Sequence, residues 1–406
     1  MDPFATLPNE ILLFVVQQVP DLGSLHNLRS ASPAVASLIR EDGNAARITE
    51  AVLSATLPDK TQEVVRTLAF VLWGPHSGGP PLASWSAFRH LYHILPIGHA
   101  APPVSEQLPR EMPSSVLCRV LALSTNVHRV AHGCLHTLMN RFLSLRPRRP
   151  AHPRFNYRRS NFWKSLDRET RQPKPYEPPP QPPSEPAKPS ARLAGEAAAP
   201  LAWVEEQSAL NAAWRLALIS ALHKSVDSRQ CAWPSEDVEK LKNLSPVEFW
   251  DLLIGSTSEA EMEWVRAMSD YIGSEVSSSH LLSKQMGAAR NCCMAIQAAP
   301  DGDWIHDKDQ FGQVSAGYSF FREARTLPYS PLRGADFGVF RQYGFGLWST
   351  KRMMGMALLP DPQMTEERFG GNWQNEEHSL FYSWYSILTA QELVDLEDTQ
   401  RTHWPN

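Results

Sequence analysis

The first forty residues place apolar and polar positions with the period of short α-helices. Behind Leu7 and Pro8, apolar residues recur at spacings of three and four, at Ile11, Leu12, Val15, Val16 and Val19. This spacing predicts a helix with a broad apolar face. Pro8 suits its first turn, because the missing N–H would find no partner there.

Two more short helices are predicted directly after the first. Asp21 can cap the second helix, and Ser32-Pro33 reads as the cap and first turn of the third. Their apolar positions are Leu22, Leu25, Leu28, Val35, Leu38 and Ile39. Three helices this short cannot bury so many aliphatic side chains among themselves, so we expect the surplus to face a partner.

The rest of the chain predicts a mainly α fold in four segments. Residues 1–42 form the three-helix module and residues 43–145 a helical region, whose last helix is expected to break near Ser124-Thr125. Residues 146–200 form a basic and proline-rich linker with no pattern that would build a core. Residues 201–406 form a mostly helical C-terminal globular domain, whose first helix shares Trp203, Leu210, Trp214, Leu218 and Leu222 on one face.

The N-terminal pattern of Leu-Pro-x-Glu-Ile-Leu, further aliphatic residues, Leu-x-x-Leu and a small capped helix resembles the F-box over residues 4–40. F-box domains are three-helix modules that bind the small Skp-type adaptor of cullin-RING ubiquitin ligases. The matching positions are Leu7, Pro8, Glu10, Ile11, Leu12, Val15, Leu25, Leu28 and Leu38. The alternative is a generic helical hairpin that begins an all-α domain.

The resemblance implies a non-catalytic substrate adaptor of an SCF-type ligase, with the Skp-type adaptor, the cullin scaffold and an unknown protein substrate as partners. The residues that it implies in contact with the Skp-type adaptor are Leu7, Pro8, Ile11, Leu12 and Val15. Those shared between contact and module core are Leu25, Leu28, Val35 and Leu38. Val35 replaces the large aromatic residue usual in the family, and a smaller anchor can weaken binding by about 1–3 kcal/mol.

A second interpretation is an interaction or regulatory protein with an F-box fold and no ligase. In that case the basic tract contacts nucleic acid. A pulldown separates the two interpretations, because only the ligase adaptor brings down the cullin scaffold together with the Skp-type adaptor.

Composition narrows the class of protein further. A hydrophobic fraction of 42% and a net charge of −4 are ordinary for a globular protein and exclude a globally basic nucleic-acid binder. No window approaches the roughly 20 apolar residues of a membrane span. The five cysteines are scattered and form no CxxC pair, which favours a reducing compartment. We therefore expect a cytoplasmic or nuclear protein without a membrane partner.

The linker combines positive charge with aromatic side chains. Its members are Arg146, Arg148, Arg149, Arg154, Phe155, Tyr157, Arg158, Arg159, Phe162, Trp163, Lys164 and Arg168. A solvated linker, a nuclear import signal and a nucleic-acid-binding arm all fit this composition, with nucleic acid the least favoured. The prolines between Pro175 and Pro183 offer PxxP docking, which is also common in linkers.

Four groups of residues have side chains that could bind a metal. His128, His132 and His136 share one side of a helix, but Arg129 and Val130 occupy the positions where a zinc-binding HExxH motif has its carboxylate. His90 and His93 offer no better site. Cys292 and Cys293 are expected to be buried small apolar residues. A calcium loop from Asp307 lacks its final carboxylate, because Tyr318 takes that position. We expect neither a metal nor a cofactor.

A second resemblance lies near the C-terminus. An Arg-x-x-Gly-aromatic-x-x-Trp-x-x-x-Arg element, formed by Arg341, Gly344, Phe345, Trp348 and Arg352, is similar to one in many F-box-like proteins of filamentous fungi. The apolar residues around it predict a buried core. They are Phe337, Phe340, Phe345, Leu347 and Trp348.

Overall fold

The computed structural model describes residues 2–41, 43–74, 84–91, 107–149, 185–187, 195–227, 233–254, 259–275, 315–327, 330–360 and 380–403. Within these residues the chain is mainly helical, as predicted, and the strands are two pairs of residues, β1 (Arg148–Arg149) and β2 (Glu185–Pro186).

The three N-terminal helices form where the sequence predicts them. They are α1 (Asn9–Gln17), α2 (Leu22–Ala31) and α3 (Pro33–Arg40). Asp21 caps α2 by accepting a hydrogen bond from the Ser24 N–H, and Ser32 caps α3 by accepting one from the Val35 N–H. Pro8 lies one position earlier than expected, as the residue that precedes α1 in an extended conformation.

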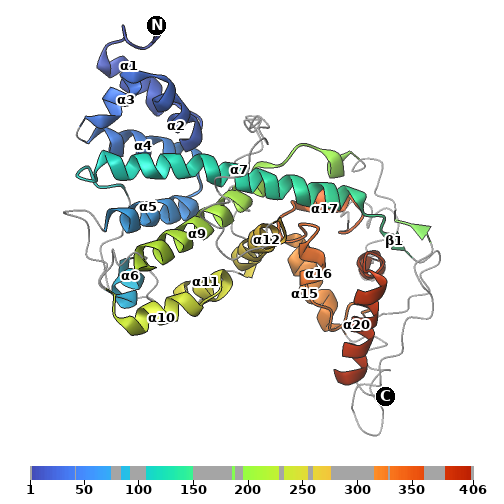
Figure 1. Ribbon diagram of the computed structural model, residues 1–406. Coiled ribbons are helices and arrows are strands. Elements are labelled where there is room, and N and C mark those ends of the chain that lie inside the picture. The colour runs from blue at the N-terminus through green and yellow to red at the C-terminus, as the bar shows by residue number, and fades with distance from the viewer. Residues whose placement is uncertain are drawn as a thin grey trace. The chain divides into compact units, whose positions relative to one another are not determined.

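A fourth helix completes this module. Helix α4 (Asn44–Thr56) packs against α1, α2 and α3, and the four helices form one cluster at the N-terminal end of the chain (Figure 1). Their shared core contains Leu12, Val16, Leu25, Val35, Ile48 and Val52. Because α4 covers the side of α1 that carries Leu12 and Val16, it decides which apolar face of α1 is buried.

The remaining α-helices all lie within residues 43–145 and 201–406, the two regions that the sequence predicts to be helical. They are α5 (Asp59–Trp73), α6 (Trp85–Leu91), α7 (Ser114–Ser144), α9 (Trp203–Asp227), α10 (Ser235–Asn243), α11 (Pro246–Ile254), α12 (Glu259–Glu275), α15 (Ala316–Thr326), α16 (Gly338–Arg341), α17 (Thr350–Gly355) and α20 (Ala390–His403); a 3₁₀ turn, η1, spans Glu196–Ala198. The predicted break near Ser124-Thr125 is wrong: α7 is continuous through both residues, and the buried Ser124 hydroxyl donates to the Leu121 carbonyl within the helix.

Two compact units make up the chain. The first comprises Met1–Leu135 and Glu206–Gly312, and the second comprises His136–Glu205 and Gln313–Asn406. The division falls within helices α7 and α9, so each unit joins segments that are remote in sequence. The four predicted segments, by contrast, follow one another along the chain.

The first unit contains a layer of charged and polar side chains between α5, α9 and α12. Glu261 accepts hydrogen bonds from Arg215 at 2.5 Å and from Lys60 at 2.6 Å, and Asn211 donates to Thr61 at 2.9 Å. Burial raises the pKa of Glu261, but the two cations outweigh burial and leave that pKa below its usual value. The first unit is therefore stabilised by ion pairs as well as by apolar packing.

The second unit is built around aromatic side chains. Phe337, Phe340, Phe345, Leu347 and Trp348 are all at most 4% exposed, which confirms that they are core residues. Trp384 lies among them. Its ring centroid is 4.6 Å from that of Phe345, and its Nε1 donates to the Leu358 carbonyl. Large buried rings of this kind contribute much of the apolar area that stabilises a small unit.

Within the basic and proline-rich segment, residues 150–184 are bounded by two short strands that pair with each other in the second unit. Strands β1 and β2 pair antiparallel, with Arg149 opposite Glu185, and the Ala187 N–H donates to the Pro147 carbonyl. The Arg148 N–H donates to the Ser386 hydroxyl. Residues 150–184 between the strands lie outside the described part of the chain, but the pairing holds the two ends of that segment together.

Candidate partner-binding surface

The exposed side of α1 carries a compact apolar surface. Five large apolar side chains of the described residues are exposed, and three of them, Ile11, Phe14 and Val15, lie within one turn and a half of α1. Their exposed fractions are 51%, 63% and 38%. Single exposed apolar residues are normal, whereas a cluster of them on one helix face is typical of an interaction site. We name Ile11, Phe14 and Val15 the α1 surface.

The segment before α1 is held in place by Asp2. Its carboxylate accepts hydrogen bonds from the Ala34 N–H at 3.0 Å, the Ser32 hydroxyl at 2.8 Å and the Phe4 N–H at 3.0 Å. The N–H donors of Ala34 and Phe4 lower the pKa of Asp2 below its usual value. Asp2 therefore ties the N-terminus to the start of α3 and fixes how Leu7 and Pro8 lead into α1.

The predicted contact residues divide into two groups in the structure. Pro8, Ile11 and Val15 are exposed and Leu7 is half-buried, so these four are accessible to a partner. Leu12 is only 2% exposed, and its assignment as a contact residue is corrected to the module core, because its side of α1 packs on α3 and α4. Substituting Leu12 would test folding rather than binding.

The residues predicted to share contact and core are mainly core. Leu25, Val35 and Leu38 are at most 3% exposed, and Leu28 is half-buried. Val35 is therefore inside the module rather than at its surface, so its small size does not by itself reduce the accessible apolar area.

Phe14 is the residue that the sequence interpretation missed. It is the most exposed large apolar side chain of the described residues. The signal was its position three residues after Ile11 and one before Val15, which places all three on one side of a helix. The resemblance drew attention to positions that match the family, and Phe14 is not one of them.

The α1 surface lies in an acidic stretch of the sequence. Residues 1–25 contain Asp2, Glu10 and Asp21 but no Lys, Arg or His. Because Ile11, Phe14 and Val15 are all apolar, association through them would depend mainly on burial of apolar area, which salt screens little.

Two of the three histidines on one side of α7, His128 and His132, lie close to carboxylates at α2 and α9. The rings of His128 and His132 stack at 6.3 Å, His128 lies 4.0 Å from Asp21, and His132 lies 3.0 Å from Glu206. Across the described ranges, no three His, Cys, Asp or Glu side chains are grouped so as to hold a metal ion. His128 and His132 thus take part in the packing of α7 against its neighbours.

The element from Arg341 to Arg352 organises the core of the second unit. Gly344 has a φ of +79°, and a Cβ there would come within 2.6 Å of the Trp348 ring. The Trp348 Nε1 donates to the Tyr343 carbonyl at 2.6 Å, and Arg352 forms a buried ion pair with Glu205. Each of these residue types has a packing role, so the element is explained by folding.

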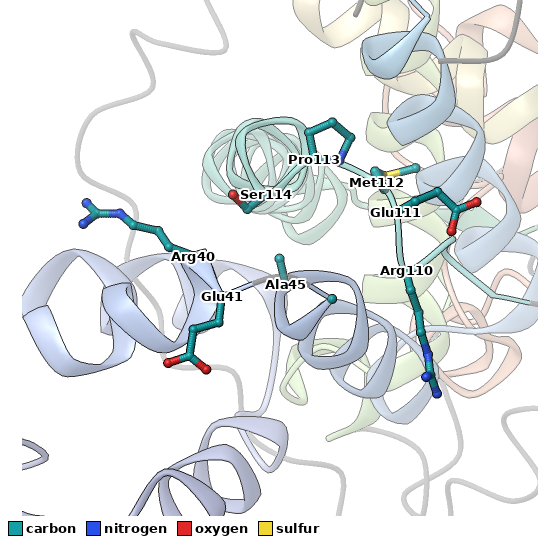
Figure 2. Close-up of a pocket in the computed structure, with 9 residues that line it drawn as sticks. Arg40, Glu41, Ala45, Arg110, Glu111, Met112, Pro113 and Ser114 are labelled. Carbon is teal, nitrogen blue, oxygen red and sulfur yellow. The ribbon is translucent and has the colours of Figure 1, made fainter. Parts of the chain in front are cut away.

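A shallow cavity of about 350 Å³ lies between the α3–α4 turn and the start of α7. Figure 2 shows Arg40, Glu41 and Arg110 extending away from this space, while Ala45 and Ser114 border it. The charged side chains do not converge on a common point, so the cavity has no set of groups placed to bind a ligand.

Several predicted features lie outside the described residues. They are His93, the Cys292-Cys293 pair, the loop from Asp307, and the linker residues from Arg154 to Pro183. The side chains of His90 and Arg149 are also outside the described part of the structure. Among the described cysteines, Cys118 and Cys134 form no disulfide bond.

Comparisons with models of known protein families, with curated proteins and with solved structures found no match to this chain. No helix among the described residues is both long and apolar enough to cross a membrane.

Proposed function

We propose that the protein is a substrate-recognition adaptor of an SCF-type cullin-RING ubiquitin ligase. In this proposal the N-terminal helices bind a Skp-type adaptor, and the rest of the chain recruits an unknown protein for ubiquitination. The observation that carries the proposal is the α1 surface, which exposes Ile11, Phe14 and Val15 on a helix whose sequence resembles the start of an F-box.

The chemistry of this surface suits a protein partner. Burying three large apolar side chains contributes roughly 1.5–3 kcal/mol for each side chain removed fully from water. The surface is presented by a helix that α3, α4 and Asp2 already fix, so little conformational entropy is lost on binding. The role in ubiquitin transfer would be proximity, because holding a target near the conjugating enzyme raises its effective concentration.

The test is co-purification of the full-length protein with a Skp-type adaptor and the cullin scaffold. The test variant is Ile11→Asp/Val15→Asp, which places two charges in the surface expected to be desolvated. The matched control is Val394→Asp, because Val394 is 51% exposed as well but lies on α20. We expect the double variant to lose both partners and the control to retain them, with unchanged melting temperatures.

Other outcomes reject the proposal in distinguishable ways. Recovery of the Skp-type adaptor without the cullin scaffold would favour the non-ligase interaction protein. Equal recovery from the double variant and from the wild type would show that the α1 surface is not the binding site. Recovery of neither partner by the wild type would reject the F-box interpretation itself.

A further inference from the structure

Four titratable side chains form a row across three helices of the first unit. Asp21 at the start of α2 lies 4.0 Å from the Nε2 of His128, and His132 one turn later lies 3.0 Å from Glu206 of α9. The two imidazole rings between them are nearly parallel, at 16°. The row therefore connects the N-terminal helices with α9 through the middle of α7.

Helix α2 lies very close to α7 beside this row. A Cβ placed on Gly23 would be 3.8 Å from both the Ser124 hydroxyl and the Thr125 Cα. The side chains of His128 and Asp21 are only 17% and 14% exposed. Water consequently has little access to the imidazole of His128, and a positive charge there would lose most of its hydration.

Asp21 offers only partial compensation for such a charge. Its Oδ1 already accepts the Ser24 N–H at 2.8 Å, and its Oδ2 accepts the Ser24 hydroxyl at 2.6 Å. At 4.0 Å, the Nε2 of His128 is too far from Asp21 for a hydrogen bond. A protonated His128 would thus have an attractive neighbour but no direct acceptor in Asp21.

The other groups around His128 do not remove this penalty. Burial lowers the pKa of His128, Asp21 and Glu206 act to raise it, His132 acts to lower it, and the net result is a pKa below the usual value. On the α12 side, the Tyr271 hydroxyl lies against Gly133, one turn beyond His128 and next to His132. The neutral imidazole is the form that the packing favours.

We propose that His128 is an acid-sensitive joint between α2 and α7, so that gain of a proton by its imidazole loosens the N-terminal helices from α7. The unfolded chain protonates this histidine near pH 6.5, whereas the folded chain resists. The contribution of His128 is therefore complete above about pH 6.5 and is lost as the pH falls below that value. This inference does not depend on which partner binds the α1 surface.

The test is hydrogen exchange of the full-length protein at pH 7.5 and 5.5, corrected for intrinsic exchange rates. In the wild type we expect peptides of α2 and of the middle of α7 to open more often at pH 5.5, by roughly threefold or more. This pH lies about one unit below the ordinary pKa of histidine, so protonation of the opened imidazole can favour the open form by up to roughly tenfold. His128→Gln should remove this acid response. His223→Gln is the matched control, because burial lowers the pKa of His223 too but it lies far along α9.

Asp21→Asn provides a second test that does not alter His128. Asparagine caps a helix as well as aspartate does, so α2 is retained while the charge that favours the imidazolium disappears. The acid response should then grow and extend to lower pH. The proposal is overturned if His128→Gln responds to acid like the wild type, if His223→Gln removes the response at α2, or if Asp21→Asn leaves it unchanged.

Discussion

Arg352 and Glu205 form a buried bidentate ion pair in which every guanidinium N–H has an acceptor. The Nε and Nη2 of Arg352 donate to the two carboxylate oxygens of Glu205, each at 2.8 Å. The remaining donors bond to the backbone carbonyls of Ala197, Ala199 and Pro200 at 2.8–2.9 Å. The pair thereby fixes the end of the proline-rich segment against α17.

Arg352→Met should destabilise the protein by about 3–5 kcal/mol, because it leaves the Glu205 charge buried without its cation and three carbonyls without donors. Only the backbone N–H groups of Ala202 and Ser349 would still donate to the Glu205 carboxylate. Glu205→Gln in the same chain should recover part of that loss by removing the unpaired charge. Urea unfolding measures both effects. Lys351→Met is the control, since the side chain of Lys351 is exposed in the same helix. Equal stability of the Arg352 and Lys351 variants would contradict the structural role of the pair.

Alanine substitutions at three glycines distinguish the cost of backbone strain from the cost of steric overlap. Gly344 has a positive φ and no room for a Cβ, Gly43 has a φ of +78° with nothing within 4 Å of a Cβ, and Gly195 has neither constraint. We expect Gly195→Ala to be within about 0.5 kcal/mol of the wild type, Gly43→Ala to lose about 1–2 kcal/mol, and Gly344→Ala to lose about 1–3 kcal/mol more than Gly43→Ala. Thermal unfolding gives the order. A Gly344 variant as stable as the Gly43 variant would mean that the Trp348 ring can move aside.

If the α1 surface binds a Skp-type adaptor as we propose, Phe14→Ala should weaken that binding without changing stability. Truncating an exposed aromatic anchor of an interface costs about 1–3 kcal/mol of binding free energy, or roughly tenfold to a hundredfold in affinity. Val16→Ala is the matched control on the same helix, because Val16 is fully buried and its truncation should lower the melting temperature instead. Titration calorimetry and thermal unfolding separate the two effects. If Phe14→Ala binds with wild-type affinity while Ile11→Asp/Val15→Asp does not, Phe14 lies outside the interface.

Residues 150–184 should be replaceable by a two-residue Asn-Gly turn between Arg149 and Glu185. These two residues are already opposite each other in an antiparallel pair, and Asn-Gly is a favoured connection for such strands. We expect the melting temperature of the shortened protein to match that of the full chain. Replacing residues 148–186 with a Gly-Ser linker is the control, since it also removes both strands and should lower the melting temperature. A large loss from the first replacement would show that residues 150–184 contribute to folding.

The shortened protein also addresses the nucleic-acid interpretation of the basic tract. Binding of single-stranded DNA at two salt concentrations should show a salt-dependent affinity if the tract neutralises phosphates. Affinity that is absent from the full-length protein, or unchanged in the shortened one, would remove that interpretation.

The local features of the N-terminal helices were predictable because their causes are local. The apolar spacing of α1 and the caps at Asp21 and Ser32 involve residues within a few positions of each other, and all appear in the structure. The same holds for the buried aromatic residues near Trp348, whose density alone indicates a core. The break predicted in α7 is wrong, and Ser124 finds an acceptor within its own helix.

The exposed surface of α1 and the core of the second unit depend on contacts between distant residues. Leu12 and Phe14 are both apolar residues of one helix, and the packing of α3 and α4 on α1 makes the first a core residue and leaves the second at the surface. Likewise, Glu205 and Arg352 are 147 positions apart, and no local pattern pairs them. The sequence by itself determined the helices, their caps and the amount of apolar surface to be covered. Tertiary structure decided which part of that surface stays exposed, because burial is settled by the partners that folding brings to each helix face.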